Sequence, residues 1–189
     1  MNEKRLDMSP LAVASRWRIE ASFIAAPIGL WFAHPTTAST LRWTPLALAG
    51  LGLRCWARGH LERRAQLTQS GPYAFVRHPL YVGSFLLGLA FCLMTNTPVL
   101  ALFFVVASLA AYVPKGMREA AFLHERYGDE YERYAARVPA VLPRIRLGRG
   151  GSTPPATLHF AWRRVLRHRE YLTWIGATAG LVAMWAFAR

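Results

Sequence analysis

The sequence predicts an all-α integral membrane protein with about five transmembrane helices, two of which form a helical hairpin. Apolar residues make up 53% of the 189 residues, and the segment 79–114 contains no charged residue. The 23 Lys and Arg residues cluster between the apolar segments. The positive-inside bias of membrane proteins produces such clusters, whereas a nucleic-acid-binding protein carries its cations on one soluble face. We therefore expect membrane lipid as a partner and no nucleic acid.

The first two predicted transmembrane helices lie within residues 19–58. The residues before them, 1–18, are polar and basic, and we expect them to form a cytosolic N-terminal segment. Residues 19–33 are almost wholly apolar and lack a small-residue cleavage site, so we expect this segment to be retained as a span. Residues 43–57 form the second span.

Four residues of the second span carry specific expectations. Pro45 would lie in the first turn of a helix that begins at residue 43, where proline is tolerated. Gly50 and Gly52 would allow another helix to approach closely. Arg54 lies near the cytoplasmic end, where we expect its long side chain to reach the lipid headgroups.

The uncharged segment 79–114 predicts the helical hairpin. At a rise of about 1.5 Å per residue it is too long for one span, and it suits two short ones. The polar residues around Asn96 supply the turn between helices at 79–94 and 98–113. Because a hairpin begins and ends on the same side of the membrane, both of its polar flanks face the same water.

The rest of the chain is predicted to be amphipathic and then membrane-spanning. Apolar residues recur at helical spacing through residue 138, and Gly128 predicts a break between two helices. Residues 148–170 form a basic linker, and residues 171–189 contain a C-terminal transmembrane helix.

The basic loops predict on which side of the membrane the flanks of the hairpin lie. Residues 1–18, 58–78 and 115–170 all fall on one side in this arrangement, which predicts that they face the cytosol. The hairpin then brings Arg77 close to Glu119. Such a cationic pocket against lipid suits a ligand with one anionic and one hydrophobic end, because arginine can bind a carboxylate through two parallel hydrogen bonds.

Two blocks of sequence form a recognisable pattern. They consist of Gly71-Pro72-Tyr73 and Arg77-His78-Pro79-Leu80-Tyr81-Val82-Gly83, followed by Glu119, Leu123, Tyr127-Gly128, Tyr131, Tyr134, Val138-Pro139 and Pro143. Together they resemble the isoprenylcysteine carboxyl methyltransferase family, with its bacterial members and the related phospholipid N-methyltransferases. The resemblance covers roughly residues 50–145.

The resemblance implies an enzyme of the bacterial inner membrane whose active site faces the cytoplasm. Its methyltransferase core would be residues 59–147, with a cytosolic helical segment that binds S-adenosylmethionine. The methyl acceptor would be lipophilic, and the family favours a carboxylate of an isoprenylcysteine-like substrate.

The resemblance also implies roles for individual residues. Arg77 and Glu119 are expected to be catalytic, and Lys115 together with Arg77 is expected to bind the substrate. The residues expected to bind the cofactor are Gln66, Leu67, Thr68, Tyr73, His78, Pro79, Leu80, Tyr81 and Glu119. Two departures from the family pattern matter: Ala120 replaces a second glutamate, and Lys115 replaces an arginine and so lacks its planar fork.

Simpler interpretations of these residues stay open. Arg77 alone is typical of an interfacial anchor, Tyr73 and Tyr81 are typical of an aromatic belt, and His78 before a proline is typical of a helix cap. A carboxylate acceptor needs no general base, whereas an amine or thiol acceptor would need one, for which His78 or Glu119 is nearest.

Other functions also stay open. They are phospholipid N-methylation, an NADPH-dependent membrane reductase, and a non-catalytic lipid-binding protein whose basic loops bind anionic headgroups. The sequence lacks the Gly-x-Gly-x-x-Gly pattern of a Rossmann site. Since the histidines have no ligand spacing with Cys55 and Cys92, we expect no metal.

Overall fold

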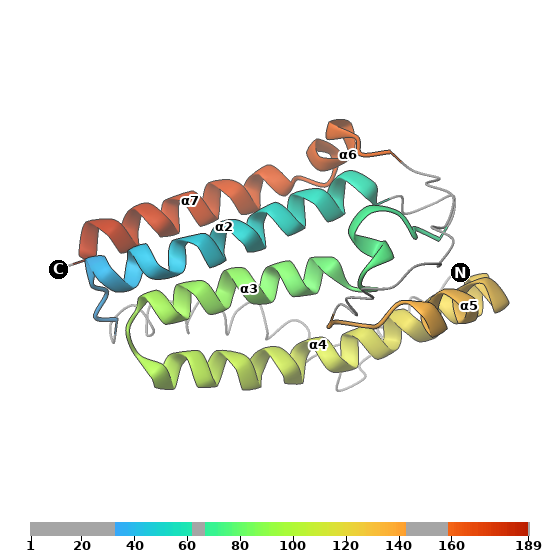
Figure 1. Cartoon of the computed structure of the whole chain (residues 1–189), viewed down its shortest axis with the longest axis horizontal. Coiled ribbons are helices and arrows are strands. Elements are labelled where there is room, and N and C mark those ends of the chain that lie inside the picture. The colour runs from blue at the N-terminus through green and yellow to red at the C-terminus, as the bar shows by residue number, and fades with distance from the viewer. Residues whose placement is uncertain (1–32, 62–66, 143–158, 189) are drawn as a thin grey trace, which may run out of the picture.

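The computed structural model describes residues 33–61, 67–142 and 159–188. Every regular element in these ranges is helical, which confirms the all-α class. The long helices α2 (Thr37–His60), α3 (Pro79–Met94), α4 (Pro98–Tyr127) and α7 (Glu170–Phe187) run side by side, and the short elements η1 (Gly71–Ala74), α5 (Asp129–Arg137) and α6 (Trp162–Arg167) gather at one end (Figure 1).

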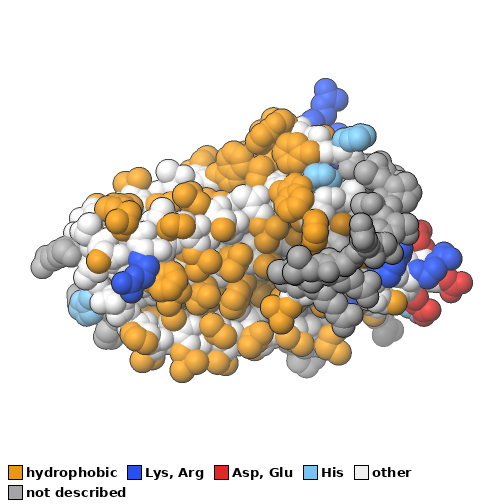
Figure 2. Space-filling model, in the orientation of Figure 1, with side chains coloured by type: hydrophobic (Ala, Val, Ile, Leu, Met, Phe, Trp, Pro, Cys, Tyr) orange, Lys and Arg blue, Asp and Glu red, His pale blue; other side chains and the backbone are white. Residues whose placement is uncertain are grey.

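The apolar surface of the long helices fits a bilayer. Within the described ranges, α4 is the helix that is long and apolar enough to cross a membrane, and α3 is apolar but shorter. The exposed residues of α4 include Val99, Leu102, Phe103 and Val106, whose spacing places them along one helix face. Hydrophobic side chains cover the middle of the molecule, whereas the acidic ones gather at the end where α5 lies (Figure 2). The predicted span at 19–33 lies outside the described residues, and the total of five spans stays a prediction.

Helix α2 begins six residues earlier than the sequence predicted. Thr36 and Ser39 form a capping box, in which the Ser39 amide donates to the Thr36 hydroxyl at 3.1 Å and the Thr36 amide donates to the Ser39 hydroxyl at 3.0 Å. The placement of Pro45 in the first turn was therefore wrong, because it lies inside the helix.

Glycines allow α2 and α3 to approach closely. A Cβ atom at Gly50 would lie 2.8 Å from the carbonyl oxygen of Gly83 and 2.8 Å from the amide nitrogen of Leu87. This confirms the helix contact predicted at Gly50. For Gly52 no such contact is seen in the described part of the chain, where a Cβ atom would meet nothing within 4 Å.

We expect Gly50→Ala to lower the free energy of unfolding by about 1–3 kcal/mol, because the added methyl group would force α2 and α3 apart. Gly52→Ala is the matched control on the same helix, and it should leave stability unchanged or slightly higher. Thermal unfolding in detergent would measure both. Equal midpoints for the two variants would show that the close approach does not matter.

The hairpin has the predicted first arm and a longer second arm. Helix α3 spans the predicted residues, but α4 continues through Pro114 to Tyr127 instead of ending at residue 113. It ends at Gly128, whose φ of 49° favours glycine, and the break predicted there is confirmed. Helix α5 follows and buries Tyr131 and Tyr134. The polar end of the second arm is therefore continuous with its apolar part in a single helix.

Candidate functional site

A cavity of about 570 Å³ lies at the end of the bundle where α2, α3, α4 and the segment before α3 meet. Most residues singled out from the sequence line it, and Gln66 lies outside the described residues. The lining includes Leu67, Thr68, Tyr73, Arg77, His78, Pro79, Leu80, Tyr81, Lys115 and Glu119. Two stretches about forty residues apart in the sequence thus contribute to one cavity.

Hydrogen bonds bring the two sequence blocks together. The amide of Arg77 donates to the Pro139 carbonyl at 2.9 Å, and the amide of His78 donates to the Ala140 carbonyl at 3.2 Å. The hydroxyl of Tyr134 donates to the carbonyl of Tyr73 at 2.7 Å in the interior. Burial raises the pKa of Tyr134, so this phenol stays protonated and remains a donor. The segment after α5 therefore holds the Arg77-His78 segment in place from the side.

Glu119 lies at the cavity with two hydrogen-bonding neighbours from the start of α3. The Tyr81 hydroxyl donates to Oε2 of Glu119 at 2.8 Å, and Nδ1 of His78 lies 3.4 Å from the same oxygen. The hydrogen bond from His78 is the largest cause that lowers the pKa of the Glu119 carboxyl, with further contributions from Tyr81 and Lys115, against burial, which raises it. Glu119 is therefore an anion at neutral pH.

Three stacked aromatic rings lie beside the Glu119 carboxylate. His78 stacks on Tyr81 with ring centroids 5.3 Å apart, and Tyr81 stacks on Tyr112 at 5.3 Å. The ammonium of Lys115 lies 4.8 Å from the centroid of the Tyr81 ring. Gly116 lies beside His78, since a Cβ atom there would be in van der Waals contact with Nε2 at 3.6 Å. The ring of Tyr81 is thus held by two stacked rings and an ammonium group, which orients its hydroxyl toward Glu119.

Arg77 lines the same cavity as Glu119, as the hairpin predicted. Its Nη1 donates to the Tyr131 hydroxyl at 3.0 Å. Its Nε is buried and has no hydrogen-bond partner among the described residues. A buried N–H group without an acceptor is costly unless a ligand accepts from it. The geometry therefore leaves Arg77 able to bind an acceptor group inside the cavity.

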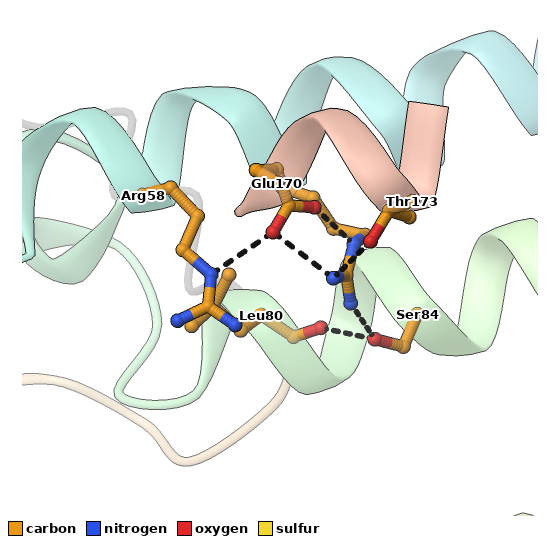
Figure 3. A network of polar contacts seen from close by, with 6 residues as sticks. Arg58, Leu80, Ser84, Glu170 and Thr173 are labelled. Atoms are coloured by element: carbon orange, nitrogen blue, oxygen red, sulfur yellow. Dashed lines mark hydrogen bonds and ion pairs between the residues drawn. The ribbon is translucent and has the colours of Figure 1, made fainter. Parts of the chain in front are cut away.

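The sequence analysis did not predict an ion-pair cluster between α2 and α7, at the cavity wall that α2 forms. The prediction that Arg54 reaches lipid headgroups was wrong: it pairs with Glu170 at the start of α7, with Nε 2.7 Å from Oε1 (Figure 3). A buried carboxylate binds a guanidinium more strongly than water-exposed headgroups do. Two signals pointed to this cluster: Arg54 and Arg58 share one face of α2 at a spacing of four, and Glu170 is the only acidic residue after Glu132.

The cavity is rich in positive charge. Glu119 is the one carboxylate in the lining formed by the described residues, whereas five cations line it. These cations are Arg54, Arg58, Arg77, Lys115 and Arg126. The described residues include no group of three or more His, Cys, Asp and Glu positions able to hold a metal ion. The site therefore combines one anion, several cations and apolar walls.

Comparison with known proteins identifies the class of enzyme to which this helical fold and cavity correspond, the membrane-bound methyltransferases. The family model for phospholipid methyltransferases matches residues 37–130. The chain is 32% identical over 148 residues to the cobalt-zinc-cadmium resistance protein CzcN of Cupriavidus metallidurans and to the nickel-cobalt-cadmium resistance protein NccN of Alcaligenes xylosoxydans xylosoxydans. The protein belongs to the family that joins isoprenylcysteine carboxyl methyltransferases and phospholipid methyltransferases.

The matches cover different shares of each relative. Each metal-resistance protein is matched over 72% of this chain, and the match covers 66% of CzcN and 67% of NccN. A protein-S-isoprenylcysteine O-methyltransferase of Schizosaccharomyces pombe is 35% identical over 79 residues, which is 42% of this chain and 34% of that enzyme. This chain therefore spans about two thirds of the length of the metal-resistance proteins and about a third of the yeast enzyme.

Proposed function

We propose that this protein transfers a methyl group from S-adenosylmethionine to a lipophilic acceptor at the membrane, and that the acceptor group is a carboxylate of an isoprenylcysteine-like substrate. We place it in the bacterial inner membrane with the cavity open to the cytoplasm. The observation that carries the proposal is the meeting of Glu119 and Arg77 in one cavity at the base of an apolar hairpin.

The cavity fits S-adenosylmethionine by size, and Glu119 supplies a negative charge for its cationic groups. Its volume of about 570 Å³ falls within the range of small-molecule sites. S-adenosylmethionine supplies a methyl group bonded to a cationic sulfur, together with a cationic ammonium group. The anionic Glu119 would attract such charges. The other residues proposed to hold it are Leu67, Thr68, Tyr73, Pro79 and Leu80, with Gln66 proposed on sequence alone.

The acceptor would be held by cations of the same cavity. The buried Nε of Arg77 has a hydrogen to donate, and Lys115 lies close enough to Tyr81 to share this wall. A carboxylate acceptor is already a nucleophile, so the protein has only to exclude water and align the reacting groups. Arg77 and Glu119 are the catalytic residues of this proposal because each would touch one of the two reacting molecules.

Phospholipid N-methylation is the second candidate, because the family model that matches residues 37–130 carries that description. An amine acceptor must lose a proton, and His78 beside Glu119 is placed to accept it. The two candidates differ in product, since a methyl ester is hydrolysed by base and an N-methyl group is not.

Labelling would test the proposal. The purified protein in lipid nanodiscs would be incubated with radiolabelled S-adenosylmethionine and either N-acetyl-S-farnesylcysteine or phosphatidylethanolamine. We expect base-labile label in the farnesylcysteine. Base-stable label in the phospholipid would establish the second candidate instead. Arg77→Ala should reduce labelling at least tenfold, whereas neutralising Arg163, Arg164, Arg167 and Arg169 together should not.

Binding measurements separate the remaining alternatives. Calorimetry should detect S-adenosylhomocysteine binding and no NADPH binding. Binding of NADPH alone would contradict the proposal in favour of a reductase. Binding of neither, with loss of vesicle association when the four arginines around α6 are neutralised, would instead identify a lipid-binding protein.

A further inference from the structure

Two arginines of α2 share a single buried carboxylate. The side chain of Glu170 is 1% exposed, and it accepts hydrogen bonds from Nε and Nη2 of Arg54 and from Nε of Arg58, the last at 3.0 Å (Figure 3). Both arginines line the cavity, whereas Glu170 does not. The wall formed by α2 and α7 therefore carries two positive charges toward the cavity and one negative charge behind them.

The two arginines differ in how many of their donors are used. Arg54 donates to Glu170 from two nitrogens and also to the hydroxyls of Ser84 and Thr173. Arg58 donates to Glu170 through Nε alone, and its Nη1 and Nη2 have no hydrogen-bond partner among the described residues. Figure 3 shows these terminal nitrogens of Arg58 turned away from Glu170. Arg54 is thus occupied, and Arg58 presents an unused pair of donors.

The charge balance favours an anion at this wall. The side chain of Arg58 is only 17% exposed, so water solvates it poorly. One carboxylate cannot neutralise two guanidinium groups, and an uncompensated charge in a buried position is costly. The terminal edge of a guanidinium holds two N–H groups in one plane, and these match the two oxygens of a carboxylate. The ammonium of Lys115 cannot make this planar contact.

The charged side chains at the α4 wall and at the α2 wall of the cavity differ in exposure, which predicts different ligands for the two walls. Lys115 and Glu119 lie on the polar part of α4 and are exposed, which suits a charged molecule arriving from water. Arg58 and Glu170 are largely covered and lie between long helices that carry exposed apolar side chains, among them Trp56 and Ile175. This second wall suits the anionic end of a molecule whose hydrocarbon chain stays in the bilayer.

We propose that Arg58, held by its ion pair with Glu170, binds the carboxylate of the lipophilic methyl acceptor. The inference rests on the proposed function and deepens it. It assigns the recognition of the acceptor's charge to α2 and to the start of α7, a helix outside the residues that the family model matches. The cofactor would then lie beside Glu119, and the carboxylate of the acceptor would be bound by Arg58 in addition to Arg77.

Equilibrium binding tests this assignment without turnover. N-acetyl-S-farnesylcysteine and its uncharged carboxamide would be titrated into the protein in nanodiscs, with tryptophan fluorescence as the readout. We expect the wild type to bind the acid at least tenfold more tightly than the amide. Arg58→Gln should lose most of this preference, because only Arg77 and Lys115 would remain to attract the carboxylate, and Arg58→Lys should retain a larger part of it. Arg167→Gln, which removes an exposed arginine of α6, is the matched control and should behave as the wild type.

The midpoint of thermal unfolding reports that each variant is folded, and Arg58→Gln should leave the affinity for S-adenosylhomocysteine unchanged. If Arg58→Gln keeps the preference for the acid, the assignment is wrong. It is also wrong if this variant loses affinity for S-adenosylhomocysteine instead, because Arg58 would then serve the cofactor. A protein that prefers the acid through Arg58 but methylates nothing would refute the proposed function and leave this binding site standing.

Discussion

Glu119→Gln is expected to lower kcat/KM for methyl transfer by at least a hundredfold and to weaken S-adenosylhomocysteine binding about tenfold to a hundredfold. Glu119 is the one carboxylate among the described residues that line the cavity, and its lowered pKa keeps it charged at neutral pH. Tyr81 and His78 both contact Oε2 of Glu119, so the substitution removes the negative charge and also disturbs the stacking of these two rings.

Calorimetry with S-adenosylhomocysteine and labelling assays would measure the two effects. Glu125→Gln is the matched control, because Glu125 is an exposed acidic residue of α4 that does not line the cavity. It should change neither quantity. If Glu119→Gln bound S-adenosylhomocysteine as tightly as the wild type, Glu119 would have no role in holding the cofactor.

Glu170→Ala is expected to lower the free energy of unfolding by about 3–5 kcal/mol. The substitution leaves Arg54 and Arg58 without their carboxylate in a place where their side chains are only 13% and 17% exposed. These ion pairs also join the start of α7 to α2, so the end of the bundle nearest the cavity should loosen first.

Thermal unfolding in detergent and hydrogen exchange of α7 would check this expectation. Glu132→Ala provides the comparison, because it removes the carboxylate of an ion pair with His124 in which both side chains are more than half exposed. Such a surface pair contributes little, so the midpoint should not move measurably. Equal midpoints for Glu170→Ala and Glu132→Ala would contradict a structural role for the buried cluster.

The parts of the fold that could be predicted are those with a strong local signal. The uncharged segment and its polar turn predicted α3 to the residue, and Gly128 predicted the end of α4 because its positive φ is costly for other residues. The end of α4 was placed too early because the change from uncharged to charged residues after residue 114 was interpreted as the end of one helix, although Pro114 lies inside it. A proline removes one backbone hydrogen bond, and the surrounding turns of a long helix tolerate that loss.

Only the part of the candidate site that follows from the helical hairpin could be predicted. The hairpin brings the residues before its first arm and after its second arm together whatever their identity, so the convergence of Arg77 and Glu119 followed from topology alone. The role of Arg54 did not follow. Its partner Glu170 lies 116 positions away in the sequence. A cation near the end of an apolar helix gives the same sequence pattern whether it faces lipid headgroups or a buried carboxylate.

The sequence by itself determined the helical class, the apolar hairpin and the two motif blocks that belong to a membrane methyltransferase family. Only the tertiary structure decided that α7 packs beside α2, that Glu170 is buried between Arg54 and Arg58, and that Arg58 keeps two donors unused. The physical reason is that hydropathy and helix signals act over a few turns, whereas the pairing of a buried charge depends on which distant helix supplies its partner.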